Sequence, residues 1–210
     1  MEIIPVINCQ DEKAVAERAQ KISGFAEWAH IDVSDAKFTF NKSWGDASAW
    51  PKIGQNLNLE VHLMVENPEN EIDAWLRVGI KRLIIHLEAI NEKIFSEIKK
   101  KTDRDKVELM IAVRPETPAE KLMAYFKEVS EFQVLAVYPG PSGQKFQTLV
   151  AKKIKFLRHE MPNATIEVDG GINEETAKLA KSAGADIAVS ASYIFNSPDP
   201  KAAYEKLSLI

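Results

Sequence analysis

Apolar and polar positions change their period repeatedly along the chain. Short apolar runs alternate with longer segments in which apolar residues recur every three to four positions. The short runs predict β-strands and the longer segments predict amphipathic helices. The predicted strands are residues 3–8, 25–33, 57–65, 82–87, 106–113, 132–138, 165–169 and 186–190. The predicted helices are residues 12–23, 47–55, 68–78, 92–101, 118–128, 146–160, 174–182 and 199–207.

This alternation is typical of an α/β fold with a parallel sheet and crossover helices. Eight repeats in 210 residues predict a compact (β/α)8 TIM barrel, with residues 1–210 forming a single domain. A doubly wound open sheet is the alternative, but it more often stops at about five to seven strands and carries a glycine-rich turn after the first strand. This chain has Asn-Cys-Gln-Asp there (residues 8–11), which favours the barrel.

Local signals mark where several helices begin. Asn and Asp side chains cap helix N-termini, and proline is favoured in the first turn. The predicted N-cap residues are Asp11, Asn67, Asn91, Thr117 and Asn173, and the predicted first-turn prolines are Pro68 and Pro118.

Composition narrows the class of partner. A net charge of -4 with dispersed lysines gives no basic surface for nucleic acid, so we expect no nucleic-acid partner. No apolar run approaches the ~20 residues that cross a bilayer, so we expect no membrane partner. Cys9 is the single cysteine and cannot form an intrachain disulfide. Because the N-terminal run also lacks the pattern of a secretory signal, we expect a cytoplasmic protein.

Metal-ligating side chains fall at the ends of three predicted strands. His30 and Asp32 share a strand face, roughly 6–7 Å apart at their Cα atoms, and His62 and Asp169 occupy comparable positions. In a barrel, the carboxyl ends of the strands carry the functional residues. Two imidazoles and two carboxylates suit zinc, iron, manganese or cobalt better than calcium or magnesium. Taken singly, each histidine is more often a core residue hydrogen-bonded to a neighbour.

Two other histidines have simpler interpretations. His86 and Glu88 also share a strand face, and a buried polar layer is the preferred interpretation for them. His159 lies among Lys, Arg and Glu residues of a predicted helix, which indicates a solvated surface position.

Small-residue turns follow the last three predicted strands, at residues 138–144, 169–173 and 190–192. Backbone N–H groups in such turns and at helix N-termini bind anions, and barrels often hold a phosphate there. The alternative is that the glycines only permit positive φ in tight turns. Three such turns on adjacent strands favour a phosphate ester.

The chain resembles the ribulose-phosphate 3-epimerase family over nearly its whole length. The motifs that carry the resemblance are His30-x-Asp32-x-x-Asp35, Val61-His62-Leu63-Met64-Val65-x-x-Pro68, Ile85-His86-Leu87-Glu88-Ala89, Pro139-Gly140-x-x-Gly143-Gln144-x-Phe146 and Val168-Asp169-Gly170-Gly171-Ile172. The resemblance implies a metal-dependent (β/α)8 barrel that interconverts D-ribulose 5-phosphate and D-xylulose 5-phosphate by inverting C3.

The resemblance also implies a role for individual residues. The metal ligands would be His30, Asp32, His62 and Asp169, with Asp32 and Asp169 as the acid/base pair. The phosphate and substrate contacts would be Gly140, Pro141, Ser142, Gly143, Gly170, Gly171, Ala191, Ser192 and Met64. Its implied partners are a small-molecule sugar phosphate and further copies of the chain, as a dimer or hexamer.

Some positions depart from the pattern of the family. Val6 stands where a serine is usual, Ser34 where a methionine is usual, and Ala191 where a glycine is usual. With Lys37 and Tyr138, these changes leave open a different ketose phosphate such as D-allulose 6-phosphate. A barrel that binds a phosphosugar without catalysis is a further alternative. A related lyase or decarboxylase is disfavoured, because Ser34 occupies the position of its Asp-x-Lys lysine.

Overall fold

The computed structural model describes residues 1–140 and 143–210. Eight parallel strands pair in chain order as a closed barrel, which confirms the predicted fold class. The strands are β1 (Glu2–Ile7), β2 (Trp28–Ser34), β3 (Asn58–Met64), β4 (Arg82–His86), β5 (Glu108–Val113), β6 (Glu131–Leu135), β7 (Thr165–Asp169) and β8 (Ile187–Ser190). The helices, with short 3-10 helices written η, are α1 (Glu12–Ile22), η1 (Ala47–Ala49), α2 (Trp50–Ile53), η2 (Pro68–Asn70), α3 (Ile72–Arg77), η3 (Leu87–Ala89), α4 (Glu92–Asp105), η4 (Ala119–Tyr125), α5 (Val150–Glu160), α6 (Glu174–Ala183), α7 (Ser192–Phe195) and α8 (Pro200–Ser208).

Contacts between residues divide the chain into two compact units. The first unit is Val6–Leu109, and the second unit is Met1–Pro5 with Met110–Ile210. That residues 1–210 form a single domain stays a prediction. Within the described ranges, no helix has the length and apolar character needed to cross a membrane.

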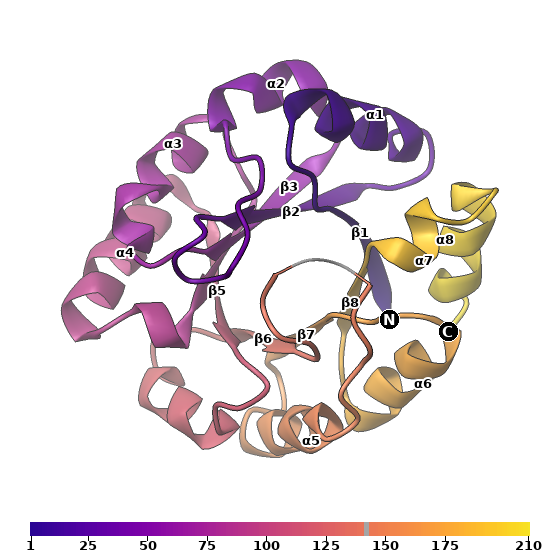
Figure 1. Cartoon of the computed structure of the whole chain (residues 1–210). Coiled ribbons are helices and arrows are strands. Elements are labelled where there is room, and N and C mark those ends of the chain that lie inside the picture. Colours follow the sequence, from indigo (N-terminus) through magenta and orange to yellow (C-terminus); the bar gives the residue numbers. More distant parts are fainter. Residues whose placement is uncertain (141–142) are drawn as a thin grey trace. The chain divides into compact units, whose positions relative to one another are not determined.

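The first unit contains β2, β3 and β4, with helices α1 to α4 along their outer side (Figure 1). Its strands are buried on both faces, and the two faces differ in chemistry. On β2, Ala29, Ile31 and Val33 form an apolar face, whereas His30 and Asp32 belong to the other face. The apolar face packs under the helices, so the polar face is the one that can form a site.

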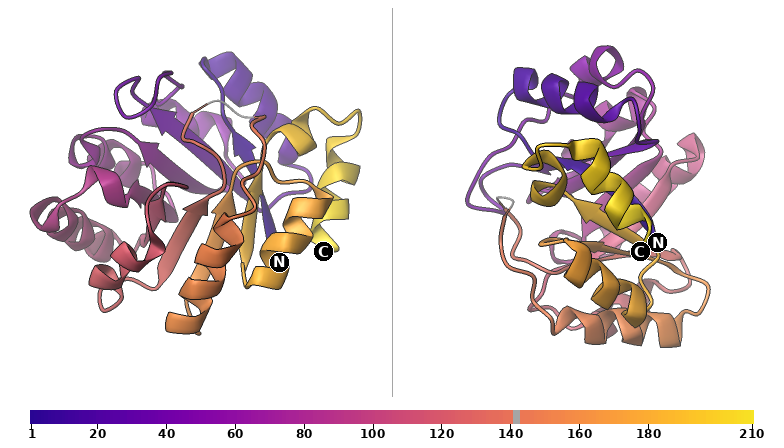
Figure 2. Two further views of the ribbon diagram at one scale, coloured as in Figure 1. Left: turned by 60° about the horizontal axis from the view of Figure 1, so that its bottom comes forward. Right: turned by 90° about the vertical axis from the view of Figure 1, so that its right-hand side faces the viewer.

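The second unit contains β6, β7 and β8, flanked by α5, α6 and α8 (Figure 2). Strand β7 alternates in the same way, with Ile166 and Val168 buried on one face and Glu167 on the other. Gln133 on β6 donates a hydrogen bond from Nε2 to Glu167 Oε1 at 2.7 Å. The three small-residue turns follow the strands of this unit.

The predicted N-terminal signals hold at Asp11, Asn91 and Asn173, whose side chains accept backbone N–H bonds at the starts of α1, α4 and α6. The Asn67 side chain makes no cap hydrogen bond. Thr117 is not an N-cap: Pro118 takes that position with extended torsions, so Pro118 is not a first-turn proline either.

Several predicted elements are shorter or divided. The predicted helices 47–55 and 68–78 each split into a 3-10 turn followed by a short α-helix. In the range predicted as the helix 118–128, residues Ala119–Tyr125 instead form the 3-10 helix η4, in which amides bond to carbonyls three residues back, as from Lys121 to Pro118. The four-residue α7 was not predicted, because it is too short to show a helical period.

One correction concerns the strand predicted at 132–138 and the helix predicted at 146–160. Strand β6 ends at Leu135, and α5 begins at Val150. The chain folds back between them, since the Gln147 amide donates to the Ala136 carbonyl at 2.8 Å. That contact uses the Ala136 carbonyl, a group that a longer strand would offer to a neighbouring strand.

Candidate functional site

Three of the predicted metal ligands meet at the carboxyl ends of β2 and β3. Asp32 and His62 are partners in the parallel register of these strands. Asp32 Oδ1 lies 3.2 Å from His30 Nε2 and 3.1 Å from His62 Nδ1. Their ligand atoms lie within 4.8 Å of one another, and all three residues are buried. The structure thus confirms that these three side chains converge.

A buried carboxylate determines which nitrogen of His30 carries the proton. Glu60 Oε1 lies 2.7 Å from His30 Nδ1, and Glu60 Oε2 accepts a 2.5 Å bond from Arg82 Nη1. Because an ionised carboxylate is an acceptor only, His30 Nδ1 must be the donor. In the neutral imidazole, Nε2 then presents its lone pair to the side of Asp32.

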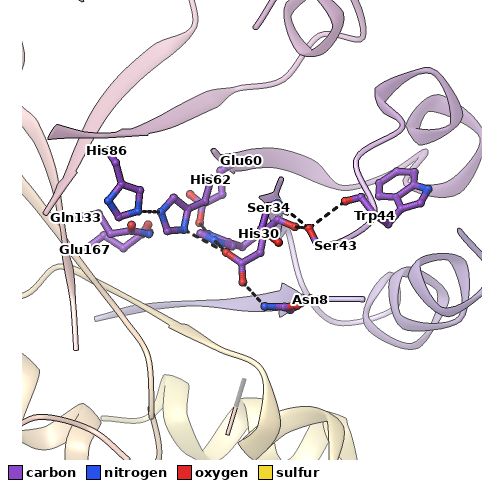
Figure 3. A network of polar contacts seen from close by, with 11 residues as sticks. Asn8, His30, Ser34, Ser43, Trp44, Glu60, His62, His86, Gln133 and Glu167 are labelled. Atoms are coloured by element: carbon purple, nitrogen blue, oxygen red, sulfur yellow. Dashed lines mark hydrogen bonds and ion pairs between the residues drawn. The ribbon is translucent and has the colours of Figure 1, made fainter. Parts of the chain in front are cut away.

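A second series of contacts begins at His62, whose ring lies next to that of His86 (Figure 3). His62 Nε2 lies 2.9 Å from His86 Nε2, and His86 Nδ1 lies 3.1 Å from Glu88 Oε2. When His86 Nδ1 donates to the Glu88 carboxylate and both rings are neutral, His86 Nε2 accepts from His62 Nε2. In this tautomer His62 Nδ1 presents its lone pair to the side of Asp32.

With both imidazoles neutral in these tautomers, two nitrogen lone pairs and a carboxylate oxygen lie around one point. Such groups repel one another unless a cation lies among them, and buried polar groups are costly without a partner. Neutral imidazole nitrogens and a carboxylate are ligands for zinc and other first-row transition metals. The residues of the first unit therefore fit a divalent transition metal, held by His30, Asp32 and His62.

The protonation equilibria of the cluster show the same attraction for positive charge. Burial alone lowers the pKa of His30, but hydrogen bonds to the Asp32 and Glu60 carboxylates outweigh it and raise that pKa well above its usual value. Burial alone raises the pKa of Asp32, but its bonds to His30 and His62 lower that pKa far below the usual range. Asp32 is therefore held as a carboxylate.

Two polar side chains outside these strands position Asp32. Asn8, the residue after β1, donates from Nδ2 to Asp32 Oδ2 at 2.8 Å, and Arg18 of α1 donates to the Asn8 carbonyl at 3.1 Å. Ser43 Oγ accepts from the Ser34 amide at 2.9 Å and donates to the Asp32 carbonyl at 2.7 Å. Asp32 is thus held by hydrogen bonds to both its side chain and its backbone carbonyl.

Beyond the three ligands, β2 and β3 end in Ser34 and Met64, which are register partners and both buried. In the described part of the chain, Ser34 Oγ has no hydrogen-bond partner. Met64, a predicted substrate contact, therefore lies next to a hydroxyl rather than next to a second thioether.

In the second unit, Asp169 is the last residue of β7, at the strand end that the sequence predicted. Gly170 and Gly171 follow with φ of +109° and +66°. A Cβ on Gly170 would lie 2.4 Å from Val137, and one on Gly171 would lie 2.7 Å from the Phe146 amide nitrogen. These glycines are therefore required by the turn itself, as the alternative interpretation held.

The three predicted phosphate turns lie together within this unit. The close approaches of Gly170 and Gly171 connect the turns after β6 and β7. Ser190 Oγ donates to the Ile172 carbonyl at 3.2 Å, which connects the turn after β7 to the end of β8.

The remaining predicted phosphate contacts differ in their backbone torsions. Gly140 and Gly143 have positive φ, whereas Pro141 and Ser142 lie outside the described residues. Ala191 has a φ of -100°, so alanine replaces the usual glycine there without strain, and Ser192 begins α7.

Of the other histidines, His86 belongs to the predicted buried polar layer and His159 is exposed, as expected. Three residues of this cluster were not predicted from the sequence, namely Glu60, Arg82 and Asn8. A signal existed for Glu60, which stands two residues before His62 in an apolar run and so shares its face. Asn8 and Arg82 gave no comparable local signal.

A closed parallel β/α barrel with buried imidazole and carboxylate side chains at its strand ends is the architecture of a barrel enzyme. Residues 2–195 match the model of the ribulose-phosphate 3 epimerase family. The chain is 34% identical to the ribulose-phosphate 3-epimerase of Chlamydia pneumoniae, over 98% of this chain and 92% of that protein. It is 36% identical to the enzyme of the same name from Chlamydia muridarum, over 92% of this chain and 87% of that protein.

A crystal structure of 3-hexulose-6-phosphate synthase has the same fold, with a TM-score of 0.75 at 15% identity, and the match covers 100% of this chain and 99% of that one. The chain belongs to the ribulose-phosphate 3-epimerase family, and it is an isomerase of the epimerase type.

Proposed function

We propose that the protein is a metal-dependent ketose-phosphate 3-epimerase that interconverts D-ribulose 5-phosphate and D-xylulose 5-phosphate. The carrying observation is the convergence of His30, Asp32 and His62, in which one ring nitrogen of each histidine lies 3.2 or 3.1 Å from Asp32 Oδ1. Family membership supports this substrate, because relatives that match nearly the full length of the chain are named ribulose-phosphate 3-epimerases.

Asp169 completes the proposed site as fourth ligand and second carboxylate. Its support is the motif that runs from Val168 to Ile172 and its position as the last residue of β7. A bound zinc, iron, manganese or cobalt ion would offset the negative charge that develops on the C2 and C3 oxygens of the sugar.

The acid/base chemistry belongs to the two aspartates. One carboxylate removes the C3 proton beside the C2 ketone, which gives an enediolate, and the other carboxyl group delivers a proton to the opposite face. Asp32 Oδ1 faces the imidazoles and Oδ2 is held by Asn8. Oδ2 is therefore the oxygen that we assign to proton transfer, with Asn8 fixing its direction.

The turns after β6, β7 and β8 are the proposed phosphate site. Their support is that Gly170, Gly171 and Ser190 bring these turns together in one unit. Ala191 and Ser192 offer backbone N–H groups at the same end of the unit, because Ala191 adopts ordinary negative φ.

The test is an exchange assay in D2O with metal-loaded protein and D-ribulose 5-phosphate. We expect deuterium at C3 together with D-xylulose 5-phosphate. Asp32→Asn and Asp169→Asn should each abolish epimer formation, whereas Asp103→Asn, which removes an exposed carboxylate of α4, should not. The bound metal of each variant is measured, so that loss of a ligand is distinguished from loss of a base.

Two outcomes would contradict parts of the proposal. If wild-type protein gives neither exchange nor product with each of the four metals in turn, the pentose substrate is wrong. D-allulose 6-phosphate is then assayed next. If Asp169→Asn epimerises at the wild-type rate, Asp169 is not the second acid/base group.

A further inference from the structure

Ser34 is the last residue of β2, and its side chain belongs to the same strand face as those of His30 and Asp32. Its register partner Met64 ends β3, so these two residues form the row that follows Asp32 and His62 along the strands. Ser34 is only 3% exposed, and its Oγ has no hydrogen-bond partner within the described part of the chain. The strand thus ends in a buried hydroxyl beside the proposed metal ligands.

The backbone of Ser34 is held on both sides by one neighbour. The Ser34 amide donates to Ser43 Oγ at 2.9 Å, and the Ser34 carbonyl accepts from the Ser43 amide at 3.2 Å. A hydroxyl has one proton to donate, and Ser43 Oγ donates to the Asp32 carbonyl at 2.7 Å. Ser43 lies beside Ser34 (Figure 3), but its polar groups bond to the backbone rather than to the Ser34 hydroxyl.

We propose that Ser34 is a specificity-determining residue whose hydroxyl binds the C1 hydroxyl group of the ketose phosphate. This inference rests on the proposed function, which places the reacting carbons at Asp32 and the two histidines. A buried polar group lowers stability unless it is hydrogen-bonded, so the free protein keeps this hydroxyl at a cost. A site that hydrogen-bonds a substrate hydroxyl in this way rejects an analogue that lacks it.

The other oxygen atoms of a ketopentose phosphate have partners elsewhere in the proposed site. The C2 and C3 oxygens face the metal ion, and C5 carries the phosphate that we assign to the turns after β6, β7 and β8. The C4 hydroxyl lies between the reacting carbon and this phosphate. C1 is next to C2 at the end of the sugar without phosphate. Ser34 follows Asp32 on the same strand and is not part of a phosphate turn, which favours C1.

The test compares two ligands that differ at this one position. D-Xylulose 5-phosphate carries the C1 hydroxyl, whereas 1-deoxy-D-xylulose 5-phosphate carries a methyl group there. Isothermal titration calorimetry of metal-loaded protein gives the Kd of each ligand, and the ratio of the two Kd values is the discrimination. Epimerisation at C3 leaves C1 unchanged, so turnover during the titration does not affect the comparison. Turnover is assayed separately.

Three variants separate hydrogen bonding from shape. Ser34→Ala removes the hydroxyl, and Ser34→Cys keeps a similar shape with a much weaker donor. Ser23→Ala is the control, because Ser23 is an exposed serine at the end of α1 whose Oγ donates to the Gln20 carbonyl.

We expect wild-type protein and Ser23→Ala to prefer D-xylulose 5-phosphate over the deoxy ligand. The discrimination should fall about 5-fold in Ser34→Ala, which is the effect of one neutral hydrogen bond. It should fall nearly as far in Ser34→Cys. Urea unfolding of ligand-free Ser34→Ala should show no loss of stability, whereas removal of a hydroxyl with a structural role would lower stability.

Unchanged discrimination in Ser34→Ala overturns the inference, even if both ligands bind more weakly. Full discrimination in Ser34→Cys also overturns it, because shape alone would then suffice. If wild-type protein binds both ligands without epimerising either, the proposed reaction fails, and the discrimination still decides the role of Ser34. If wild-type protein binds neither ligand, both proposals are overturned.

Discussion

Glu60 offers a sharp test of how the site is held together, because one arginine contacts both it and a more exposed glutamate. Arg82 donates from Nη1 to Glu60 Oε2 at 2.5 Å and from Nε to Glu108 Oε2 at 2.9 Å. The Glu60 side chain is 0% exposed and the Glu108 side chain is 51% exposed. The same cation therefore makes a buried ion pair and a solvated one, and Glu→Gln can be made at each.

Glu60→Gln should destabilise the protein far more than Glu108→Gln. Glu60→Gln leaves the Arg82 guanidinium facing a neutral amide. The amide has one acceptor oxygen, so it cannot accept hydrogen bonds from both Arg82 and His30 as the carboxylate does with its two oxygens. Breaking a buried pair by removing one partner costs about 3–5 kcal/mol. An exposed pair contributes about 0–1 kcal/mol. We expect a difference of roughly 3 kcal/mol between the two variants.

The assay is urea unfolding of metal-free protein, followed by both circular dichroism and tryptophan fluorescence. Metal is removed because a ligand that binds only the native state adds its own stability. Coincident transitions by the two probes would allow a two-state free energy to be extracted. If Glu60→Gln costs less than 1 kcal/mol more than Glu108→Gln, the buried ion pair does not have the role we assign to it.

Three further predictions concern the loops around the site. Burial alone raises the pKa of Asp35, but backbone N–H bonds from Glu66, Lys37 and Phe38 outweigh it and lower that pKa. The wild-type stability advantage over Asp35→Asn should therefore be full above about pH 4 and disappear as the pH falls through the lowered native pKa, as measured by thermal melting. In urea unfolding, Gly171→Ala should lower the free energy of unfolding by several kcal/mol and Gly79→Ala by only about 1 kcal/mol. Both glycines have positive φ, but of the two only Gly171 faces a backbone nitrogen within the described chain. Equal losses of stability would contradict this. Ser34→Ala should raise the free energy of unfolding by about 1 kcal/mol in metal-free protein, since it removes a buried hydroxyl that lacks a partner among the described residues, and a loss would contradict it.

The sequence predicted the fold well where a single local rule decides. Strand 165–169 has the predicted bounds, because apolar residues alternate up to Asp169 and Gly170 then turns the chain. Prediction failed where a backbone hydrogen bond joins residues that are distant in the sequence. The Gln147 amide bonds to the Ala136 carbonyl just after the end of β6, and neither residue reveals this contact locally.

The candidate site shows the same division. His30, Asp32 and His62 could be found because each identity and its strand-end position are properties of one short run. Their partners could not all be found in this way. Asn8 contacts Asp32 across 24 residues, and Arg82 contacts Glu60 across 22 residues. Alternation can tell that Glu60 shares a face with His62, but it cannot tell which neighbouring strand lies beside it.

Register is what converts these separate motifs into one site. His30, Glu60 and Arg82 are successive partners in one row across β2, β3 and β4, and Asp32 and His62 are partners in the row that follows toward the strand ends. A slip of β3 by one residue would turn both Glu60 and His62 to the opposite face, under the helices. The ion pair between Glu60 and Arg82 opposes such a slip, because the slip would separate the two charged groups and leave each without its partner. The residues that set the tautomer of His30 thus also hold β3 in the register that brings His62 to Asp32.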